Sequence, residues 1–215
     1  GEQVTVTGMI GGSTGRRIEE EMRKEGLDSR FVPIGGESRI CINVMDEKNN
    51  TSTEILEPGP VVTAEEGEAF LARYRKLLEE CSVVTASGSL PKGLPADFYA
   101  ILIRLAKEQG KKFILDTSGE FFRKGIMEKP YMIKPNMDEL TGIREDNPES
   151  RNKEMRMEDC IESVRSFKAR GIGLPVVSLG KHGCIAALED GVYHFATPDV
   201  RVINTVGSGD SFVAG

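Results

Sequence analysis

Residues 83–115 read VVTASGSLPKGLPADFYAILIRLAKEQGKKFIL and predict a strand, a helix and a second strand. Residues 83–86 and 113–115 are short, continuous apolar runs, which is typical of strands that are buried on both faces of a sheet. Between them Pro95 suits the first turn of a helix that ends before Gly110. The apolar stripe of this helix consists of Phe98, Ile101, Leu102 and Leu105. Together these signals predict a β-α-β unit with parallel strands.

The same alternation continues on both sides of this stretch. Residues 3–7 alternate like a strand, and residues 131–133 and 176–179 are further apolar strands. Amphipathic helices are expected after Ser13 or Thr14 as an N-cap, after a Thr63/Glu66 capping box, and around Ile161, Val164 and Phe167. The polar residues 144–158 are predicted to form a solvated loop. The fold class is therefore α/β, with a mostly parallel sheet covered by helices on both faces.

Residues 30–56 interrupt this alternation. Segments 30–34, 38–46 and 51–56 are strand-like and predict a small antiparallel sheet inserted into the α/β domain. The expected organisation is an α/β core of residues 1–29 and 57–215 and a β lid of residues 30–56. Either a flap over an active site or an ordinary edge extension fits the pattern. Both chain ends look cut, so we expect the core to be truncated at its two ends.

Composition excludes several classes of protein. Lysine and arginine number 28 against 34 acidic residues, a net charge of −6, which argues against a nucleic-acid-binding protein. Apolar runs are far shorter than the roughly 20 residues that span a bilayer, so no membrane partner is expected. The four cysteines, Cys41, Cys81, Cys160 and Cys184, lack the short spacing of a metal cluster. Reduced, buried thiols fit a cytoplasmic protein.

The sharpest local motif is NTVGSGDSF at residues 204–212. Gly207 and Gly209 allow a tight turn that brings successive backbone N–H groups toward one point, where a helix start would bind an anion. Asp210 in that turn could accept a proton from an alcohol while the N–H groups stabilise a phosphoryl group. The alternative is that Asp210 is an ordinary helix N-cap.

Three further motifs follow predicted strands. In KPNMDE (134–139), Asn136 and Glu139 offer oxygen ligands that suit Mg²⁺, although a capping box would use the same two residues. SLGKHG (178–183) contains two glycines that permit close approach of a nucleotide, or form a plain β-turn. SGSLP (87–91) ends another strand and could be a simple loop. In an open α/β sheet, ligands bind at the carboxyl edge where such motifs gather.

In this combination and order, the motifs resemble those of the ribokinase-like sugar kinases of the phosphofructokinase B family. The resemblance covers the whole chain. Within the family, GSLPKGLPADFYA (88–100), ESRICINV (37–44) and GSGDS (207–211) are most similar to bacterial 1-phosphofructokinases and tagatose-6-phosphate kinases. It implies ATP-dependent phosphorylation of a ketohexose phosphate by a cytoplasmic transferase that uses Mg²⁺. It also implies a homodimer formed through the lid.

The resemblance assigns a role to residues of each motif. Asp210 is the expected catalytic base, and the backbone anion hole consists of Gly207, Ser208 and Gly209. Asn136 and Glu139 are expected to organise Mg²⁺. The nucleotide site is expected to include Lys134, Asn136, Ser178, Gly180 and Gly183.

The sugar side is expected to involve Arg39 and Ser89. Arg39 on the lid matches an arginine that binds the sugar phosphate, and a guanidinium suits that anion. Without a lid, Arg39 would be an ordinary solvated strand residue. Full-length relatives carry further sugar-binding and adenine-covering segments that are expected to lie outside residues 1–215.

The favoured reaction converts fructose 1-phosphate to fructose 1,6-bisphosphate, and tagatose-6-phosphate kinase is the alternative. A non-catalytic sugar-phosphate-binding protein on the same fold is the competing class. A Rossmann dehydrogenase is excluded, because residues 8–12, GMIGG, lack the G-x-G-x-x-G spacing.

Overall fold

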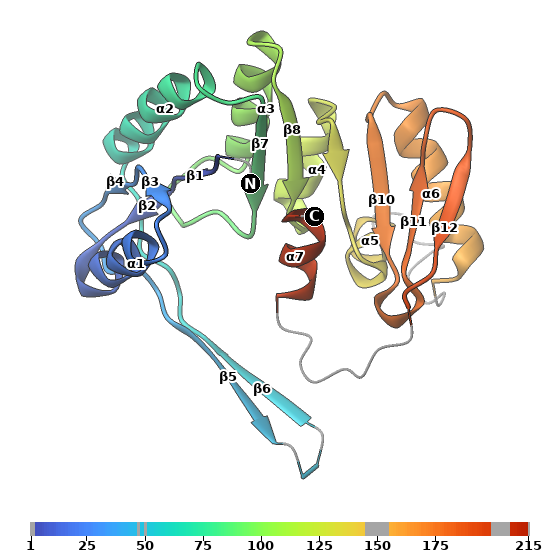
Figure 1. The fold of residues 1–215 in the computed structure, drawn as a ribbon, viewed down its shortest axis with the longest axis horizontal. Helices are drawn as coiled ribbons and strands as arrows, with labels where there is room; N and C mark the ends of the chain where they lie inside the picture. The colour runs from blue at the N-terminus through green and yellow to red at the C-terminus, as the bar shows by residue number, and fades with distance from the viewer. Residues whose placement is uncertain (1–2, 47, 50, 145–154, 199–206, 215) are drawn as a thin grey trace. The chain divides into compact units, whose positions relative to one another are not determined.

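The computed structural model describes most of the chain as two compact units (Figure 1). The described residues are 3–46, 48–49, 51–144, 155–198 and 207–214. One unit comprises Gly1–Leu77 and Pro91–Pro95, and the other comprises Leu78–Leu90 and Ala96–Gly215. Each unit is described by itself. The division into a core and a lid of residues 30–56 stays a prediction.

The first unit contains short paired strands, a hairpin and two helices. Its elements are β1 (Thr5–Val6), β2 (Met9–Ile10), α1 (Gly12–Lys24), β3 (Asp28–Ser29), β4 (Val32–Pro33), β5 (Cys41–Asp46), β6 (Thr51–Leu56) and α2 (Ala64–Leu78). Strand β1 pairs in parallel with β3, and β2 pairs in parallel with β4. Strands β5 and β6 form an antiparallel hairpin.

The pairing of β4 corrects one expectation. Residues 30–34 were expected in the inserted antiparallel sheet, but β4 joins β2 in a parallel pair, and the antiparallel sheet consists of β5 and β6 alone. An apolar run of this length has no feature that identifies its partner, because strand pairing is decided by contacts far apart in sequence. All twelve residues of β5 and β6 are exposed.

The start of α1 also differs from the expectation. Gly11, not Ser13 or Thr14, is the N-cap residue, and a glycine has no side chain with which to cap the helix. The carboxylate of Glu37 takes that role from a distant loop, since the backbone N–H groups of Ser13 and Thr14 donate to it at 3.1 and 2.6 Å. These hydrogen bonds lower the pKa of Glu37 to about 2, and the one from the Thr14 backbone N–H has the largest effect.

Helix α2 begins as expected from its capping box. The backbone N–H of Thr63 donates to Glu66 at 2.8 Å, and the Glu66 N–H donates to the Thr63 hydroxyl at 3.2 Å. One face of the helix is apolar and buried: Phe70, Leu71, Tyr74, Leu77 and Leu78. A local sequence signal is therefore sufficient to place this helix and its buried face.

The second unit is built on a six-stranded sheet in the order β12-β11-β10-β9-β8-β7. Its strands are β7 (Val83–Ser87), β8 (Lys112–Asp116), β9 (Met132–Ile133), β10 (Leu174–Ser178), β11 (Cys184–Ala187) and β12 (Val192–Phe195). Its helices are α3 (Phe98–Glu108), α4 (Gly119–Met127), α5 (Met137–Arg144), α6 (Met157–Ala169) and α7 (Ser208–Ala214), with a 3₁₀ turn η2 (Gly180–His182).

Four neighbouring strands, β7 to β10, run parallel, and β11 and β12 add an antiparallel hairpin at one edge. Helices α3 and α4 pack on β8, and α6 packs on β10 and β11. This arrangement confirms the α/β class and the mostly parallel sheet. Pro95 was expected in the first turn of this helix, but α3 begins at Phe98, so Pro95 lies before the helix. Of the polar segment 144–158, residues 145–154 lie outside the described residues, whereas Met157 and Glu158 belong to α6.

The core of this unit lies between the sheet and its helices. Alternate strand residues are almost completely buried: Phe113, Leu115, Ile133, Val177 and Ile185. They meet helix residues of comparable burial: Ile103, Ala106, Phe122, Cys160 and Val164. Among the helices that the structure describes, none has the length and apolar character needed to span a bilayer.

The Glu37 cap predicts a pH-dependent contribution to stability. A carboxyl whose pKa is lowered on folding stabilises the fold above its unfolded value of 4.5, and this contribution is lost as the pH falls toward 2. Glu37→Gln should therefore lower the free energy of unfolding at pH 7, and the difference from the wild type should shrink between pH 4.5 and 2. Urea unfolding followed by circular dichroism measures both. Glu68→Gln, an exposed carboxyl on α2, is the control, and an equal loss in both variants would contradict the assignment.

Candidate active site

The carboxyl ends of four parallel strands meet at one edge of the second unit. Strand register pairs Ser87 with Asp116, Leu115 with Ile133 and Ile133 with Pro175. The predicted motifs at residues 87–91, 134–139 and 178–183 all begin at this edge. Figure 1 shows α7 beside the same ends of the strands. This is the edge where ligands of open α/β sheets bind.

A buried lysine and a largely buried aspartate form an ion pair at the centre of this edge. The ammonium of Lys134, which directly follows β9, is 3.3 Å from a carboxylate oxygen of Asp116, the last residue of β8. Lys134 is only 6% exposed. Burial raises the pKa of Asp116, whereas Lys134 lowers it and the nearby charge of Asp210 raises it further.

The glycine-rich turn stands next to this ion pair. Gly207 has a φ of +76°, a conformation that favours glycine, and α7 begins at the following residue. A Cβ at Gly209 would lie 3.5 Å from the Lys134 ammonium. Asp210 is exposed and within electrostatic range of Asp116. The structure thus places Gly209 beside Lys134 and Asp210 within electrostatic range of Asp116, and their roles in the reaction stay predictions.

The loop at residues 87–91 is tied to β8. The Gly88 N–H donates to the Asp116 carbonyl at 2.9 Å, while the Gly88 carbonyl accepts from the hydroxyls of Thr117 and Tyr99 at 2.8 and 3.0 Å. Burial, and secondarily the charge of Asp116, raises the pKa of Tyr99 to about 12. The phenol is therefore a hydrogen-bond donor at neutral pH, and it holds the exposed Ser89 close to the strand end.

Asn136 and Glu139 form a reciprocal capping box at the start of α5. The Asn136 N–H donates to one Glu139 carboxylate oxygen at 2.9 Å, and the Glu139 N–H donates to the Asn136 side-chain oxygen at 2.8 Å. This is the structural alternative foreseen for the pair, and it leaves the second carboxylate oxygen of Glu139 for another ligand. Within the described part of the chain, no group of three acidic, histidine or cysteine side chains could hold a metal ion by itself.

Ser178 and the two glycines after it lie beside this capping box. Asn136 and Ser178 form an isolated parallel bridge, and the Ser178 N–H donates to the Pro135 carbonyl at 3.0 Å. Gly180 and Gly183 have φ angles of +57° and +88°. A Cβ at Gly183 would lie 1.8 Å from the carbonyl oxygen of Phe195, so its glycine is required by packing against β12. A nucleotide-binding role for these glycines stays a prediction.

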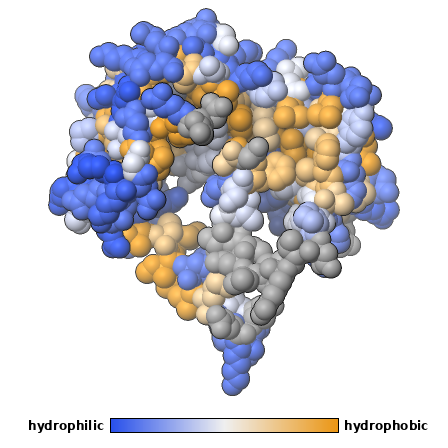
Figure 2. Space-filling model, viewed as in Figure 1, coloured by the Kyte–Doolittle hydropathy of each residue, from blue (hydrophilic) through white to orange (hydrophobic). Residues whose placement is uncertain are grey.

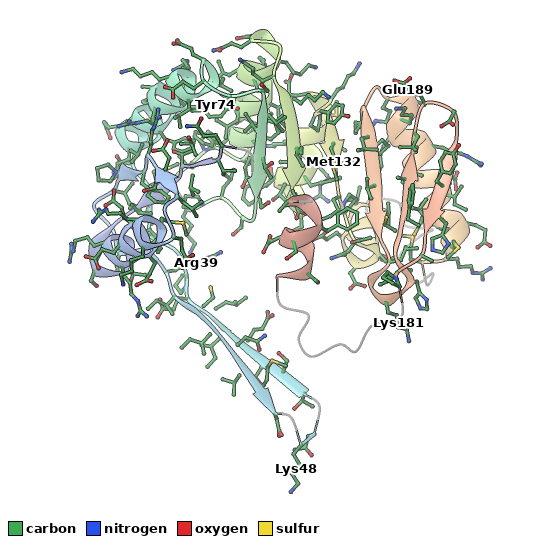
Figure 3. All side chains as sticks on the ribbon, viewed as in Figure 1. Arg39, Lys48, Tyr74, Met132, Lys181 and Glu189 are labelled. Carbon is green, nitrogen blue, oxygen red and sulfur yellow. The ribbon has the colours of Figure 1, made fainter. Side chains whose placement is uncertain are left out.

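Arg39 belongs to the other unit. Figure 3 shows it at the base of the β5–β6 hairpin, with Lys48 at the tip. Arg39 is exposed, which fits both a ligand-binding residue and an ordinary solvated one, so its role stays a prediction.

Asp116 is the site residue that the sequence motifs did not reveal. It follows the apolar run 113–115 just as Lys134 follows 131–133, so a polar residue directly after a buried strand was the available signal. Lys134 begins the KPNMDE motif, whereas Asp116 is followed by Thr117 and Ser118, which form no recognisable motif.

Comparisons with known proteins identify the family of the chain. The model of the pfkB family carbohydrate kinases matches residues 1–215. Tagatose-6-phosphate kinase of Staphylococcus epidermidis is 40% identical over 217 residues, which span 100% of this chain and 68% of that protein.

Solved structures show the same fold. Phosphofructokinase-2 of Escherichia coli, in its tetrameric inhibited form, superposes with a TM-score of 0.85 at 25% identity over 97% of this chain and 67% of that one. A Thermotoga maritima protein named "Possible 1-phosphofructokinase" superposes with a TM-score of 0.84 at 29% identity, over 98% and 66% of the two chains. On the match of its full length to the family model, this chain belongs to the pfkB family of carbohydrate kinases.

Proposed function

We propose that the protein transfers the terminal phosphoryl group of ATP to a ketohexose phosphate. The observation that carries this proposal is an exposed Asp210 on a glycine-rich turn, next to the buried Lys134 at the carboxyl edge of the sheet. A carboxylate that can accept a proton and a fixed cation that can meet phosphate oxygens are the two groups such a transfer needs. The family membership and the 40% identity to a tagatose-6-phosphate kinase support the same reaction.

The chemistry follows from the functional groups. The Asp210 carboxylate takes the proton of the acceptor hydroxyl as that oxygen forms a bond to the γ-phosphorus of ATP. The bond between the γ-phosphorus and the β,γ-bridging oxygen breaks, and its electron pair leaves with ADP. Of the predicted anion-hole residues, Ser208 and Gly209 have backbone N–H groups in the first turn of α7, where these groups have no partner within the helix, and Gly207 directly precedes them. We assign them, with Lys134, to the negative charge of the transferred group.

The residues present can hold Mg²⁺ only together with oxygen ligands from the phosphates of the substrate and from water. Asn136 and Glu139 each use one oxygen for the capping box, and one carboxylate oxygen of Glu139 remains. Mg²⁺ commonly binds through one or two carboxylates, waters and substrate phosphates, so this donor set suffices when ATP is bound. The ion would neutralise phosphate charge, with Glu139 and Asn136 holding it directly or through water.

The sugar is recognised through its own phosphate. Arg39 is the residue we assign to that phosphate, because a guanidinium donates two parallel hydrogen bonds to an anion. Fructose 1-phosphate, phosphorylated at its 6-hydroxyl, is the substrate we favour. Tagatose 6-phosphate is the alternative, which the Staphylococcus epidermidis relative supports.

Two further features belong to this proposal. Cys41, Cys81, Cys160 and Cys184 are all free thiols, which supports a reducing, cytoplasmic location. One face of the hairpin carries Ile42, Val44 and Ile55, each more than half exposed, and Met45 and Leu56 are exposed on the other face. Figure 2 shows hydrophobic side chains along this hairpin. A second copy of the hairpin would cover such a face, and we therefore propose a homodimer formed through the lid.

Three predictions follow from the proposed function, and the first concerns the substrate and the catalytic base Asp210. Of a panel of phosphorylated and free ketohexoses, fructose 1-phosphate should give the highest kcat/KM in a coupled ADP-release assay with the full-length protein.

Asp210→Asn should lower kcat by about 10²–10⁴-fold, the usual contribution of a general base, and leave ATP affinity unchanged. Retention of more than about a tenth of the wild-type rate would contradict the role of Asp210.

The second prediction concerns Arg39. Arg39→Ala should raise KM for a ketohexose phosphate by about 10–100-fold, because a charge-assisted contact is lost, and should change KM for the free sugar by less than about threefold. Lys48→Ala, which removes a cation at the hairpin tip, is the matched control. Equal losses with phosphorylated and free sugars would rule out the phosphate contact.

The third prediction concerns the lid. Sedimentation analysis should show a dimer for the wild type and a monomer for Ile42→Asp, since a buried unpaired carboxylate is costly. Asn43→Asp, at the next position on the opposite face of β5, should remain dimeric. A wild type that stays monomeric at tens of micromolar would refute the lid interface.

A further inference from the structure

The ion pair of Asp116 and Lys134 is buried at a cost that stability alone does not explain. The two side chains are 14% and 7% exposed, and the neighbouring strand residues Leu115 and Ile133 are completely buried. Moving an ammonium and a carboxylate out of water is expensive, and well-packed apolar residues in place of such a pair are often as stable. A role in the reaction gives a reason for this pair to occupy the strand ends.

The ammonium of Lys134 has hydrogen-bonding capacity left for a ligand. It has three N–H donors. Among the described residues, its charged contact is Asp116, at 3.3 Å, which is longer than the 2.7–2.9 Å typical of a strong charge-assisted hydrogen bond. The ammonium is therefore anchored by Asp116 without being saturated.

The other side of the ammonium faces the glycine-rich turn. A Cβ at position 209 would lie 3.5 Å from the nitrogen, so the glycine there leaves this side uncovered. Asp210 is the next residue, and its charge reaches Asp116. Lys134 thus contacts the carboxylate of Asp116 on strand β8 and lies beside the turn that carries Asp210.

We propose that Asp116 is a positioning residue: it holds the Lys134 ammonium at the end of β8, directed at the phosphoryl group, and keeps it from pairing with Asp210. A lysine side chain is long and flexible, and without a fixed counter-charge it would pair with the nearest carboxylate. Pairing with Asp210 would occupy the oxygen that must receive the proton of the sugar. This inference rests on the proposed function.

The experiment is a double-mutant cycle on the full-length protein with Asp116→Asn, Lys134→Met and the double variant. Asp116→Asn should lower kcat by about 10–100-fold, the scale of a small misplacement, with KM for the sugar phosphate within about threefold of the wild type. In the Lys134→Met background, Asp116→Asn should lower kcat by less than about threefold, because Asp116 acts through the ammonium. Losses that multiply in the double variant would overturn the proposal.

Two comparisons separate positioning from a general effect on folding. Asp116→Glu keeps the charge and should recover at least part of the kcat lost in Asp116→Asn. Glu128→Gln breaks the exposed ion pair of Glu128 with Arg104 and should leave kcat unchanged. If Asp116→Asn does not fold, a kcat of Asp116→Glu equal to that of Lys134→Met overturns the proposal, and a clearly higher one supports it.

Binding of the non-hydrolysable analogue AMP-PNP distinguishes failure of this inference from failure of the proposed function. A wild type that turns over no ketohexose phosphate refutes the proposed function. Calorimetry then decides on Asp116 alone: about tenfold weaker AMP-PNP binding by Asp116→Asn supports the positioning role. Unchanged binding, or a wild type that does not bind AMP-PNP, overturns it.

Discussion

The parallel register of strands β7, β8, β9 and β10 is the constraint on which the candidate site depends. Because Leu115 pairs with Ile133, the next residues along the two strands, Asp116 and Lys134, become neighbours. The pairing of Ser87 with Asp116 brings the 87–91 loop to the same strand end. A shift of one residue in either register would turn these side chains to the opposite face of the sheet. The register is in turn held by the buried side chains on both faces of the central strands.

This constraint explains how a charged pair can lie largely out of solvent at the strand ends. Thr117 and Lys134 are the buried polar side chains of the described residues, and both have partners, Gly88 and Asp116. Each link joins the carboxyl end of β8 to a different neighbour, the loop after β7 in one case and the end of β9 in the other. Asp116 and Thr117 therefore connect the loop after β7 with the strand end of β9, and a displacement of β8 would disturb both sides of the site together.

Features that depend on nearby residues could be predicted from the sequence. The capping boxes at Thr63/Glu66 and Asn136/Glu139, the four parallel strands of the second unit and the turn before Asp210 all follow from residues within a few positions of one another. Features that depend on distant residues could not. The cap of α1 by Glu37 joins residues 23 and 24 positions apart, and Asp116 meets Lys134 only through strand pairing. No local pattern encodes such contacts, because they exist only when the sheet has formed.

The residues with proposed roles are distributed over both units. The residues assigned to phosphoryl transfer belong to the unit with the six-stranded sheet, whereas Arg39 belongs to the unit with the hairpin. A two-stranded hairpin is marginally stable in water, and every residue of β5 and β6 is exposed. Its order must therefore come from contacts beyond its own two strands. A sugar phosphate bound by Arg39 would add such a contact at the base of the hairpin, so binding of the acceptor and ordering of the hairpin would be thermodynamically coupled. The order of the Lys134–Asp116 ion pair does not depend on a bound substrate, because the residues that precede the pair on the two strands, Leu115 and Ile133, are already buried in the core.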